Sequence, residues 1–586
     1  MLFHNFASVE IKTKILGFIQ NDLKLESSCE VSPEDLPKTL ALFSAPPNPA
    51  LGDLAFPCFA MSKVLKKSPA DIAQKLAQST MSQDLPFVAS VQAQGPYLNI
   101  HLNREWFTQA VLAQVVKQGR AYGDSTWGSE KTAVIDFSSP NIAKHLAFHH
   151  LRSTVIGHSL RNIFQALGYH TLAINHLGDW GTQFGKLMVA YRAWGQGGLG
   201  DDPVGTLNAL YVRFQKEAKI TPELNDQARA AFQALEAGDV ETRKLWEEFR
   251  EISLKTFERV YQRLGITFDV VRGESYFVDQ IQPLLETLQQ KNLSEMSEGA
   301  LIVKLAAFNM PPCLLKKGDD TTLYATRDLC AALDRYREYQ FEHLFYVVDQ
   351  GQSLHFQQVF KVLELMGVPW VKKAEHVPFG IIKFAGAKTR TRDGGIILLE
   401  DVLDQAHELI AQKIQEKNPD LKNLQATAEA VGVGAIIFAD LSGRRKTDIN
   451  FDWDEMLNFE GRTGPYVQYS HARASSILAK GGDFSGADLG RLTLEAEWEL
   501  VKTLGQFPES LLKAATDREP SVMADYALSL CEAFHRYHAA GKSDVSCRVL
   551  TEDQEVRKAR LQLTHCTQLV LARALAILGL VAPQEM

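Results

Sequence analysis

Basic and polar side chains gather where a short apolar run gives way to a turn-rich segment. His149, His150 and Arg152 stand at the start of a helical pattern, shortly after the sequence Ser-Ser-Pro-Asn at 138–141. Imidazole and guanidinium groups beside the free N–H groups of a helix start form an anion site. A histidine pair at a helix start can also be a surface or capping feature. The polar residues nearby favour a binding site: Asn141, Lys144, His145, Asn175, His176, Asp179 and Gln183.

A carboxylate and a phenol further along the chain could bind a planar cation. Tyr324 and Asp328 are four residues apart, so on a helix they share a face. A carboxylate on that face can hold a guanidinium group through two hydrogen bonds. An ordinary amphipathic helix start would show the same spacing.

A basic, Gly-ended loop lies within 379–399, where we expect it to be flanked by two strands. Its cations are Lys388, Arg390 and Arg392. Several cations suit a transferring phosphoryl group because negative charge develops on its oxygens. A basic surface hairpin would have a similar composition.

Short apolar runs and one helical pattern would position these residues. The run Thr132 to Phe137 predicts a buried parallel strand, about His149 to Leu167 a helix, and His170 to Ile174 the next strand. Leu344 to Val348 predicts the other half of the same sheet. This order is the opening of a nucleotide-binding α/β sheet of the Rossmann-like kind, which binds ligands at the carboxyl ends of its strands.

The 586 residues allow three or four domains. Residues 1–120 predict a small α+β domain, because 88–102 alternates around the turn Gly95-Pro96. Residues 121–450 hold the sheet and a charged helical insertion at about 195–265, and residues 451–586 are nearly all helical.

Composition limits the class of protein. Apolar residues make up 45% and charged residues 23%, which is ordinary for a globular chain, and no apolar run approaches the roughly 20 residues that span a membrane. The N-terminus lacks the pattern of a secretory signal, and the seven cysteines are scattered without a CxxC pair. These features predict a reduced, cytoplasmic setting. With a net charge of −8, RNA binding would rely on local basic patches.

Several motifs resemble those of one family. Ser-Pro-Asn-Ile-Ala-Lys at 139–144, Leu-Arg-Ser-Thr at 151–154 and Gly-Asp-Trp-Gly-Thr-Gln-Phe-Gly at 178–185 are similar to arginyl-tRNA synthetases. Tyr-Ala-Thr-Arg-Asp at 324–328 is a further element of that family. The resemblance covers essentially the whole chain and implies a class I catalytic domain between a tRNA elbow-contacting N-terminal domain and an α-helical anticodon-binding domain of the DALR type. In the last domain, Tyr466 and Tyr469 beside Arg473 could stack unpaired bases or cap helix packing.

The resemblance implies a role for each matching residue. The arginine substrate would be held by Asp136, Asn141, Tyr324, Asp328 and Gln352. Catalytic contacts to phosphate oxygens would come from Lys144, His150, Arg390 and Arg392. The ATP site would comprise Ser139, Ala147, His149, His150, Gly178, Asp179, Gln183, His355, Lys388 and Thr391. No protein-bound metal is expected, although Mg²⁺ would accompany ATP.

One motif departs from the family. The tetrapeptide His-Ile-Gly-His of class I synthetases falls on Ala147, Phe148, His149 and His150, so only the last His is kept. Either His149 substitutes for the missing imidazole, or activity is weakened. The activity implied is an arginine–tRNA ligase acting on ATP, L-arginine and tRNA(Arg). We expect a cytoplasmic monomer without a membrane partner. The alternatives are a paralogue that binds tRNA or arginine without aminoacylation, and a different class I ligase or nucleotidyltransferase built on the same sheet.

Overall fold

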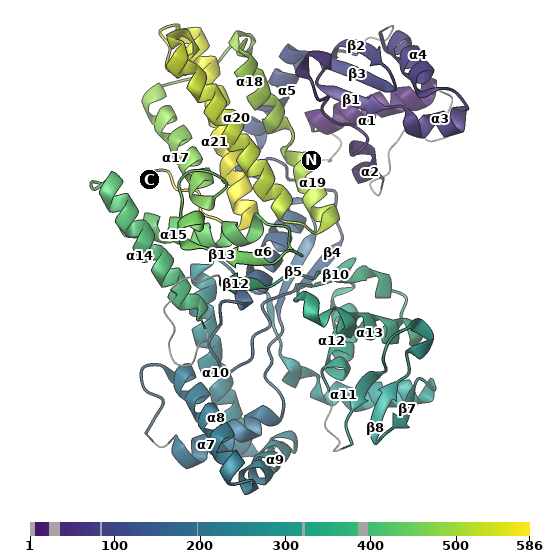
Figure 1. Cartoon of the computed structure of the whole chain (residues 1–586), viewed down its shortest axis with the longest axis vertical. Helices are drawn as coiled ribbons and strands as arrows, with labels where there is room; N and C mark the ends of the chain where they lie inside the picture. The colour runs from purple at the N-terminus through teal and green to yellow at the C-terminus, as the bar shows by residue number, and fades with distance from the viewer. Residues whose placement is uncertain (1–5, 23–34, 82–84, 196, 319–322, 385–396) are drawn as a thin grey trace.

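The structure is a computed structural model that describes residues 6–22, 35–81, 85–195, 197–318, 323–384 and 397–586 (Figure 1). A small N-terminal domain lies beside a long helical bundle formed by the end of the chain. Below the bundle lies a parallel sheet, which carries two further bodies at its lower edge (Figure 1).

The N-terminal domain has the predicted α+β composition. Its three strands, β1 (Leu54–Pro57), β2 (Val88–Gln94) and β3 (Tyr97–Leu102), form an antiparallel sheet in the order β1-β3-β2. The helices are α1 (Ala7–Asp22), α2 (Leu36–Leu40), α3 (Phe59–Leu65), α4 (Pro69–Met81) and α5 (Arg104–Gln118).

The central sheet is parallel, as the sequence predicts. Its order is β11 (Ala374–His376), β10 (His343–Tyr346), β4 (Thr132–Asp136), β5 (His170–Asn175) and β6 (Val270–Val271). The chain runs from β4 through α6 (His150–Ala166) to β5 on one side, and β10 pairs with β4 on the other. The strand order therefore reverses between β4 and β10, and such a reversal opens a ligand crevice at the carboxyl ends.

Two bodies extend from this sheet. The first contains α7 (Thr182–Trp194), α8 (Pro203–Ile220), α9 (Glu223–Glu236) and α10 (Val240–Arg263). Of these, α8 to α10 lie within the helical insertion expected at about 195–265, and α7 lies before it. The second contains α11 (Val278–Gln290), α12 (Tyr324–Tyr339), α13 (Ser353–Leu365) and an antiparallel sheet of β7 (Ser294–Ser297), β8 (Ala300–Val303) and β9 (Cys313–Lys316). A separate apolar core fills this second body.

The expectation of two strands around the basic loop was wrong in part. The first flank is strand β12 (Ile382–Phe384), but it pairs in parallel with β13 (Ile449–Phe451). In the second flank, the residues that the structure describes, from 397 on, make a single antiparallel bridge, between Leu398 and Ala147. The described residues of the two flanks thus pair with different partners and not with each other.

The rest of the chain is helical. Its helices are α14 (Leu399–Lys417), α15 (Leu424–Leu441), α16 (Trp453–Met456), α17 (Gly464–Gly481), α18 (Glu495–Gly505), α19 (Phe507–Asp517), α20 (Ser521–Ser543) and α21 (Gln554–Leu578). By length and composition α15 and α21 could cross a membrane, but 67% and 61% of their apolar windows are buried inside the protein. Such burial is typical of core helices.

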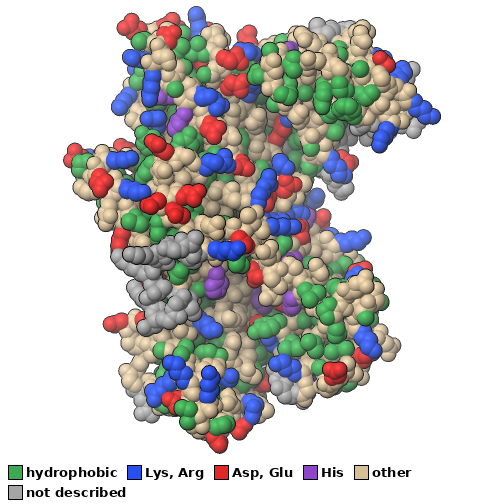
Figure 2. Space-filling view, viewed as in Figure 1, with side chains coloured by type: hydrophobic (Ala, Val, Ile, Leu, Met, Phe, Trp, Pro, Cys, Tyr) green, Lys and Arg blue, Asp and Glu red, His purple; other side chains and the backbone are tan. Residues whose placement is uncertain are grey.

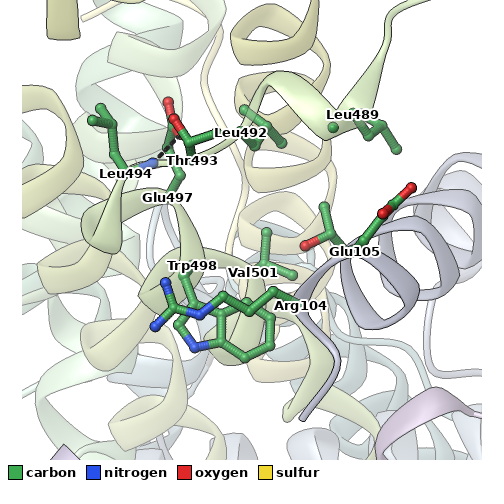
Figure 3. Close-up of a pocket in the computed structure, with 11 residues that line it drawn as sticks. Arg104, Glu105, Leu489, Leu492, Thr493, Leu494, Glu497, Trp498 and Val501 are labelled. Carbon is green, nitrogen blue, oxygen red and sulfur yellow. Dashed lines mark hydrogen bonds between the residues drawn. The ribbon is translucent and has the colours of Figure 1, made fainter. Parts of the chain in front are cut away.

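One carboxylate joins the first domain to the last. Asp53 accepts hydrogen bonds from the N–H of Leu102, from Trp498 Nε1 at 3.1 Å and from Lys502 Nζ at 3.1 Å. Arg104 lies across the Trp498 ring, with its guanidinium carbon 5.3 Å from the ring centroid. Figure 3 shows these two side chains at the floor of a cavity of about 300 Å³ between α5 and α18. The N-terminal domain is therefore held directly against the C-terminal bundle.

Candidate functional site

The start of α6 presents two imidazoles at the crevice. His150 is the first residue of the helix, and its Nδ1 accepts the N–H of Ala147 at 3.0 Å. Burial, with contributions from His149 and Lys144, lowers the pKa of His150 to about 4. The ring is therefore neutral near pH 7. Its Nδ1 also lies 3.1 Å from the carbonyl oxygen of Ala147, to which the other neutral tautomer would donate. His149 is exposed, and its ring centroid lies 4.2 Å from that of His150.

Arg152 does not belong to this anion site, contrary to the expectation from sequence. It is 1% exposed, and its Nε lies 3.0 Å from Oδ1 of Asp440 on α15. Its Nη1 donates to the carbonyls of Gly380 and Thr447. Because Arg152 lies on the side of α6 that faces the core, its side chain anchors the helix and does not bind a ligand.

Ser153 fixes the other side of the helix start. Its Oγ donates to the carbonyl of Val347 at 2.6 Å and accepts the N–H of Ser138 at 2.9 Å. These bonds tie α6 to the segments that follow β10 and β4. The Leu-Arg-Ser-Thr motif therefore sets where the histidines stand.

Asp328 and Tyr324 share one face of α12, as their spacing predicts. Asp328 Oδ2 lies 2.6 Å from His355 Nε2 on α13. Burial would raise the pKa of Asp328, but the hydrogen bond to His355 and the charges of His355, His176 and Arg335 together hold that pKa below its ordinary value. The carboxylate is thus ionised, and Tyr324, 63% exposed, stands one turn away. His355, expected on the ATP side, directly contacts the predicted arginine-binding carboxylate.

Asp136 has a buried partner that sequence reasoning missed. At the end of β4, its Oδ2 lies 2.7 Å from Nη2 of Arg335, and both side chains are buried. Ser139 Oγ donates to the other oxygen of Asp136 at 3.3 Å. Arg335 follows Asp328 by seven residues on the same helix, so helical spacing was the signal that could have revealed it. The carboxylate of Asp136 therefore lies at the crevice already paired with the Arg335 guanidinium.

A second buried pair lies beneath Tyr324. The guanidinium of Arg327 is 5.1 Å from the Tyr324 ring centroid, and its Nε lies 3.3 Å from Glu274. Burial raises the pKa of Glu274 to about 7, although Arg327 opposes the shift. Neither residue was among the predicted site residues.

Backbone contacts bring the other predicted residues to the same edge. Gly178 donates its N–H to the Pro140 carbonyl at 3.0 Å, and a Cβ at Gly178 would lie 1.9 Å from Asn141 Oδ1. Glycine is required there by this close approach. Gln352 is exposed at the end of a short turn after β10, and Gln183 is half-buried in the first turn of α7. Lys144 is exposed, with its Nζ 5.6 Å from the ring of Tyr211 on α8.

Asp179, expected at the ATP site, has a side chain that is fully enclosed by other parts of the protein. Its side chain is 0% exposed and accepts bonds from the N–H and Oγ of Ser275, both at 2.9 Å. The Nε of Arg250, on α10, lies 3.4 Å from Oδ2 of the same carboxylate. The carboxylate therefore fastens the loop after β5 to α10 and to the segment after β6.

The predicted residues Lys388, Arg390, Thr391 and Arg392 lie outside the described residues. The segment just beyond them can be followed, and it contacts the altered tetrapeptide. Phe148 donates its N–H to the Ile397 carbonyl, and Leu399 donates to Leu146, both at 2.9 Å. The chain just after the basic loop, at 397–399, is thus fixed beside His149 and His150.

These residues give the crevice two chemically distinct parts. An ionised carboxylate with a neighbouring phenol can receive a guanidinium group, and neutral imidazole donors at a helix start can receive phosphate oxygens. Figure 2 shows histidine side chains in a hollow at the middle of this face. Within the part of the chain that the structure describes, no group of three or more His, Cys, Asp or Glu could hold a metal ion.

Comparisons with known proteins account for nearly the whole chain. Residues 15–102 match the model of the arginyl-tRNA synthetase N-terminal domain, 111–453 that of the catalytic domain of class I (R) tRNA synthetases, and 467–586 that of the DALR anticodon-binding domain. The arginine–tRNA ligase of Exiguobacterium sibiricum is 47% identical over 93% of this chain and 95% of its own length. That of Ligilactobacillus salivarius is 46% identical over 95% and 97%. The solved arginyl-tRNA synthetase of Thermus thermophilus has a TM-score of 0.80 at 28% identity, covering 93% of this chain and 96% of that one.

Proposed function

This chain belongs to the arginyl-tRNA synthetases and is an arginine–tRNA ligase, and we propose that the crevice at the ends of β4 and β10 performs both of its reactions. In the first, an oxygen of the arginine carboxylate attacks the α-phosphate of ATP, and pyrophosphate leaves. In the second, a hydroxyl of the terminal tRNA ribose attacks the carbonyl of arginyl-adenylate, and AMP leaves. Neither step needs a covalent enzyme intermediate, so positioning and charge stabilisation do the work.

The observation that carries this proposal is the ionised carboxylate of Asp328, held at 2.6 Å by His355 and one helical turn from Tyr324. A guanidinium group matches such a carboxylate in charge and shape. In the proposed pocket, Asp136, Asn141 and Gln352 complete the contacts to arginine. Asp136 would orient the substrate while it remains paired with Arg335.

The ATP phosphates would lie at the start of α6. His150 would donate from Nε2 as a neutral imidazole, and Lys144 would supply a positive charge. We propose that His149 takes the place of the imidazole that Ala147 lacks, since its ring is exposed and stands beside His150. The cations at 388–392 would approach from the loop whose end is paired with Ala147.

Mg²⁺ would enter with ATP. It binds commonly through substrate phosphates and retains several waters, so it needs few protein ligands. We propose a monomeric, cytoplasmic enzyme. Support for the compartment comes from the cysteines of the described residues, which are all free thiols. The proposed domain limits, 1–120, 121–450 and 451–586, agree in order with the three family models.

A paralogue that binds tRNA without charging it is the second candidate, because Ala147 and His149 alter the tetrapeptide. The test is tRNA charging by the purified chain with arginine and ATP, with lysine and cysteine as controls. Arginine-specific charging is expected. Binding of tRNA or arginine without charging would establish the second candidate.

A further inference from the structure

Residues 378–380, here called the junction segment, lie between β11 and β12 and offer three consecutive carbonyl groups to three different parts of the protein. The first carbonyl accepts Nη1 of Arg445 at 2.5 Å, and the second accepts the N–H of Gln350 at 2.9 Å. The third accepts Nη1 of Arg152 at 2.9 Å. Because three neighbours share one short stretch of backbone, a shift of that backbone moves all three.

Two of these partners lead to the crevice. Arg152 lies two residues after His150 on α6, so its bond holds the helix start that presents the imidazoles. Gln350 begins the short turn that ends at Gln352, one of the proposed arginine contacts. The junction segment is therefore bonded to the elements that carry both the ATP part and the arginine part of the crevice.

The third partner ties the segment to the C-terminal bundle. Arg445 is buried, its Nε donates to the carbonyl of Arg518 at 2.9 Å, and its N–H donates to Oε1 of Glu519 at 3.2 Å. Its own carbonyl accepts the N–H of Gly380 at 2.8 Å, so the side chain and the main chain of Arg445 both hold the junction segment. Arg518 and Glu519 lie in the turn between α19 and α20 of the bundle, and β12 follows the junction segment at the base of that bundle (Figure 1).

Close packing keeps the junction segment against the chain that follows Arg445. A Cβ at Gly380 would lie 2.7 Å from Oδ1 of Asp448 and 2.8 Å from the carbonyl of Thr447. The same Oδ1 of Asp448 accepts the N–H of Ile381 at 3.0 Å. The segment can therefore shift only if the chain at 445–448 moves with it.

We propose that Arg445 is a positioning residue for adenylate formation, and that by fixing the junction segment to the bundle it sets the start of α6 and the turn at 350–352 relative to each other. Its effect is indirect and passes through main-chain carbonyls. A displacement of about 1 Å at a reacting group can cost roughly 100-fold in rate. The inference rests on the proposed function, because that function assigns the two parts of the crevice.

The test compares Arg445→Met with Arg560→Met in the full-length enzyme. Arg560 is a matched control, because it is also buried, pairs with Glu497 through Nε at 2.7 Å and donates to two main-chain carbonyls at 2.6 and 2.9 Å, but away from the junction segment. Urea titrations give the folded fraction of each variant. The rate constant of adenylate formation and the arginine concentration that half-saturates it are then measured from single-turnover pyrophosphate release with ATP and tRNA saturating.

Arg445→Met should lower the ratio of these two quantities by about 100-fold, through both a smaller rate constant and a higher half-saturating arginine concentration. Arg445→Lys keeps the charge and can keep one of the two carbonyl contacts, so it should lose about 10-fold. The lysine variant decides the question if the methionine variant does not fold. Arg560→Met should change neither quantity, because its contacts do not reach the crevice.

Three results would each overturn the proposal. They are unchanged kinetics in a folded Arg445 variant, a change confined to one of the two quantities, and an equal change in Arg560→Met, which would trace the loss to general weakening of the bundle. A parent enzyme that fails to charge tRNA would refute the proposed function instead, so the two failures are distinguishable.

Discussion

Replacing Asp328 by Asn tests the arginine pocket with little change in shape. The amide oxygen can still accept from His355, whose Nε2 lies 2.6 Å from the carboxylate, but the negative charge is lost. Removing one partner of a desolvated, hydrogen-bonded charge pair costs about 2–5 kcal/mol. The affinity for arginine should therefore fall by roughly 30- to 5,000-fold.

The assay is arginine-dependent tRNA charging, with citrulline as a competing ligand. Citrulline carries a neutral urea group in place of the guanidinium, so the native enzyme should discriminate strongly against it, and Asp328→Asn should lose most of that discrimination. The control is Glu342→Gln. Glu342 is a carboxylate that pairs with Lys373 just before the start of β10, so its replacement should change neither the affinity for arginine nor the discrimination against citrulline. If Asp328→Asn instead lost ATP turnover while its arginine affinity stayed intact, the assignment of the pocket would be refuted.

The other predictions concern the ATP side and stability. Asp440→Asn should lower the free energy of unfolding by about 3–5 kcal/mol, because it leaves the Arg152 guanidinium buried without its charged partner. The double variant Arg152→Met with Asp440→Leu should lose much less stability, because it removes both charges. Urea titrations that give equal losses for the two variants would contradict this. Burial lowers the pKa of His158 from 6.5 to about 4, so the neutral ring contributes its full stability above pH 6.5, and this stability is lost as the pH falls toward 4. In His158→Gln, the loss of unfolding free energy between pH 6.5 and pH 4 should be smaller by about 1–3 kcal/mol. Curves of unfolding free energy against pH that run parallel for the variant and the parent would contradict this. His149→Ala should slow adenylate formation by about 10- to 150-fold, because it removes one hydrogen bond to a charged phosphate oxygen. A normal rate would show that His149 does not replace the missing imidazole. Arg392→Ala should slow the same step by about 100-fold, and an unchanged rate would remove the loop from the mechanism.

The centre of the parallel sheet was predictable because β4 and β10 lie in short, mainly apolar runs. The edge strand β11, Ala-Glu-His, has no such signal and was not predicted. The positions of Tyr324 and Asp328 on one helical face also followed from spacing alone. The family motifs then supplied the roles that we propose for side chains at the end of the sheet.

Sequence reasoning failed where burial decides what a polar residue does. Arg152 and Asp179 lie within motifs rich in functional residues, yet both are buried against partners on distant segments, Asp440 and Ser275. Spacing within a motif carries no information about a partner 96 residues away. The pairing of Arg335 with Asp136 was missed as well because the two residues are on different elements, although the seven-residue spacing from Asp328 places Arg335 on the pocket face of α12.

The contact between Asp53 and α18 has a consequence for the order in which the protein folds during synthesis. Two of the three donors to this carboxylate, Trp498 and Lys502, follow it by 445 and 449 residues. At a translation rate of about 5–20 residues per second, they emerge from the ribosome roughly 20–90 s later. During that interval the N-terminal domain must persist with Asp53 open to water and with its docking surface uncovered. The nascent chain is therefore most exposed to aggregation and to chaperone binding before its last helices are made.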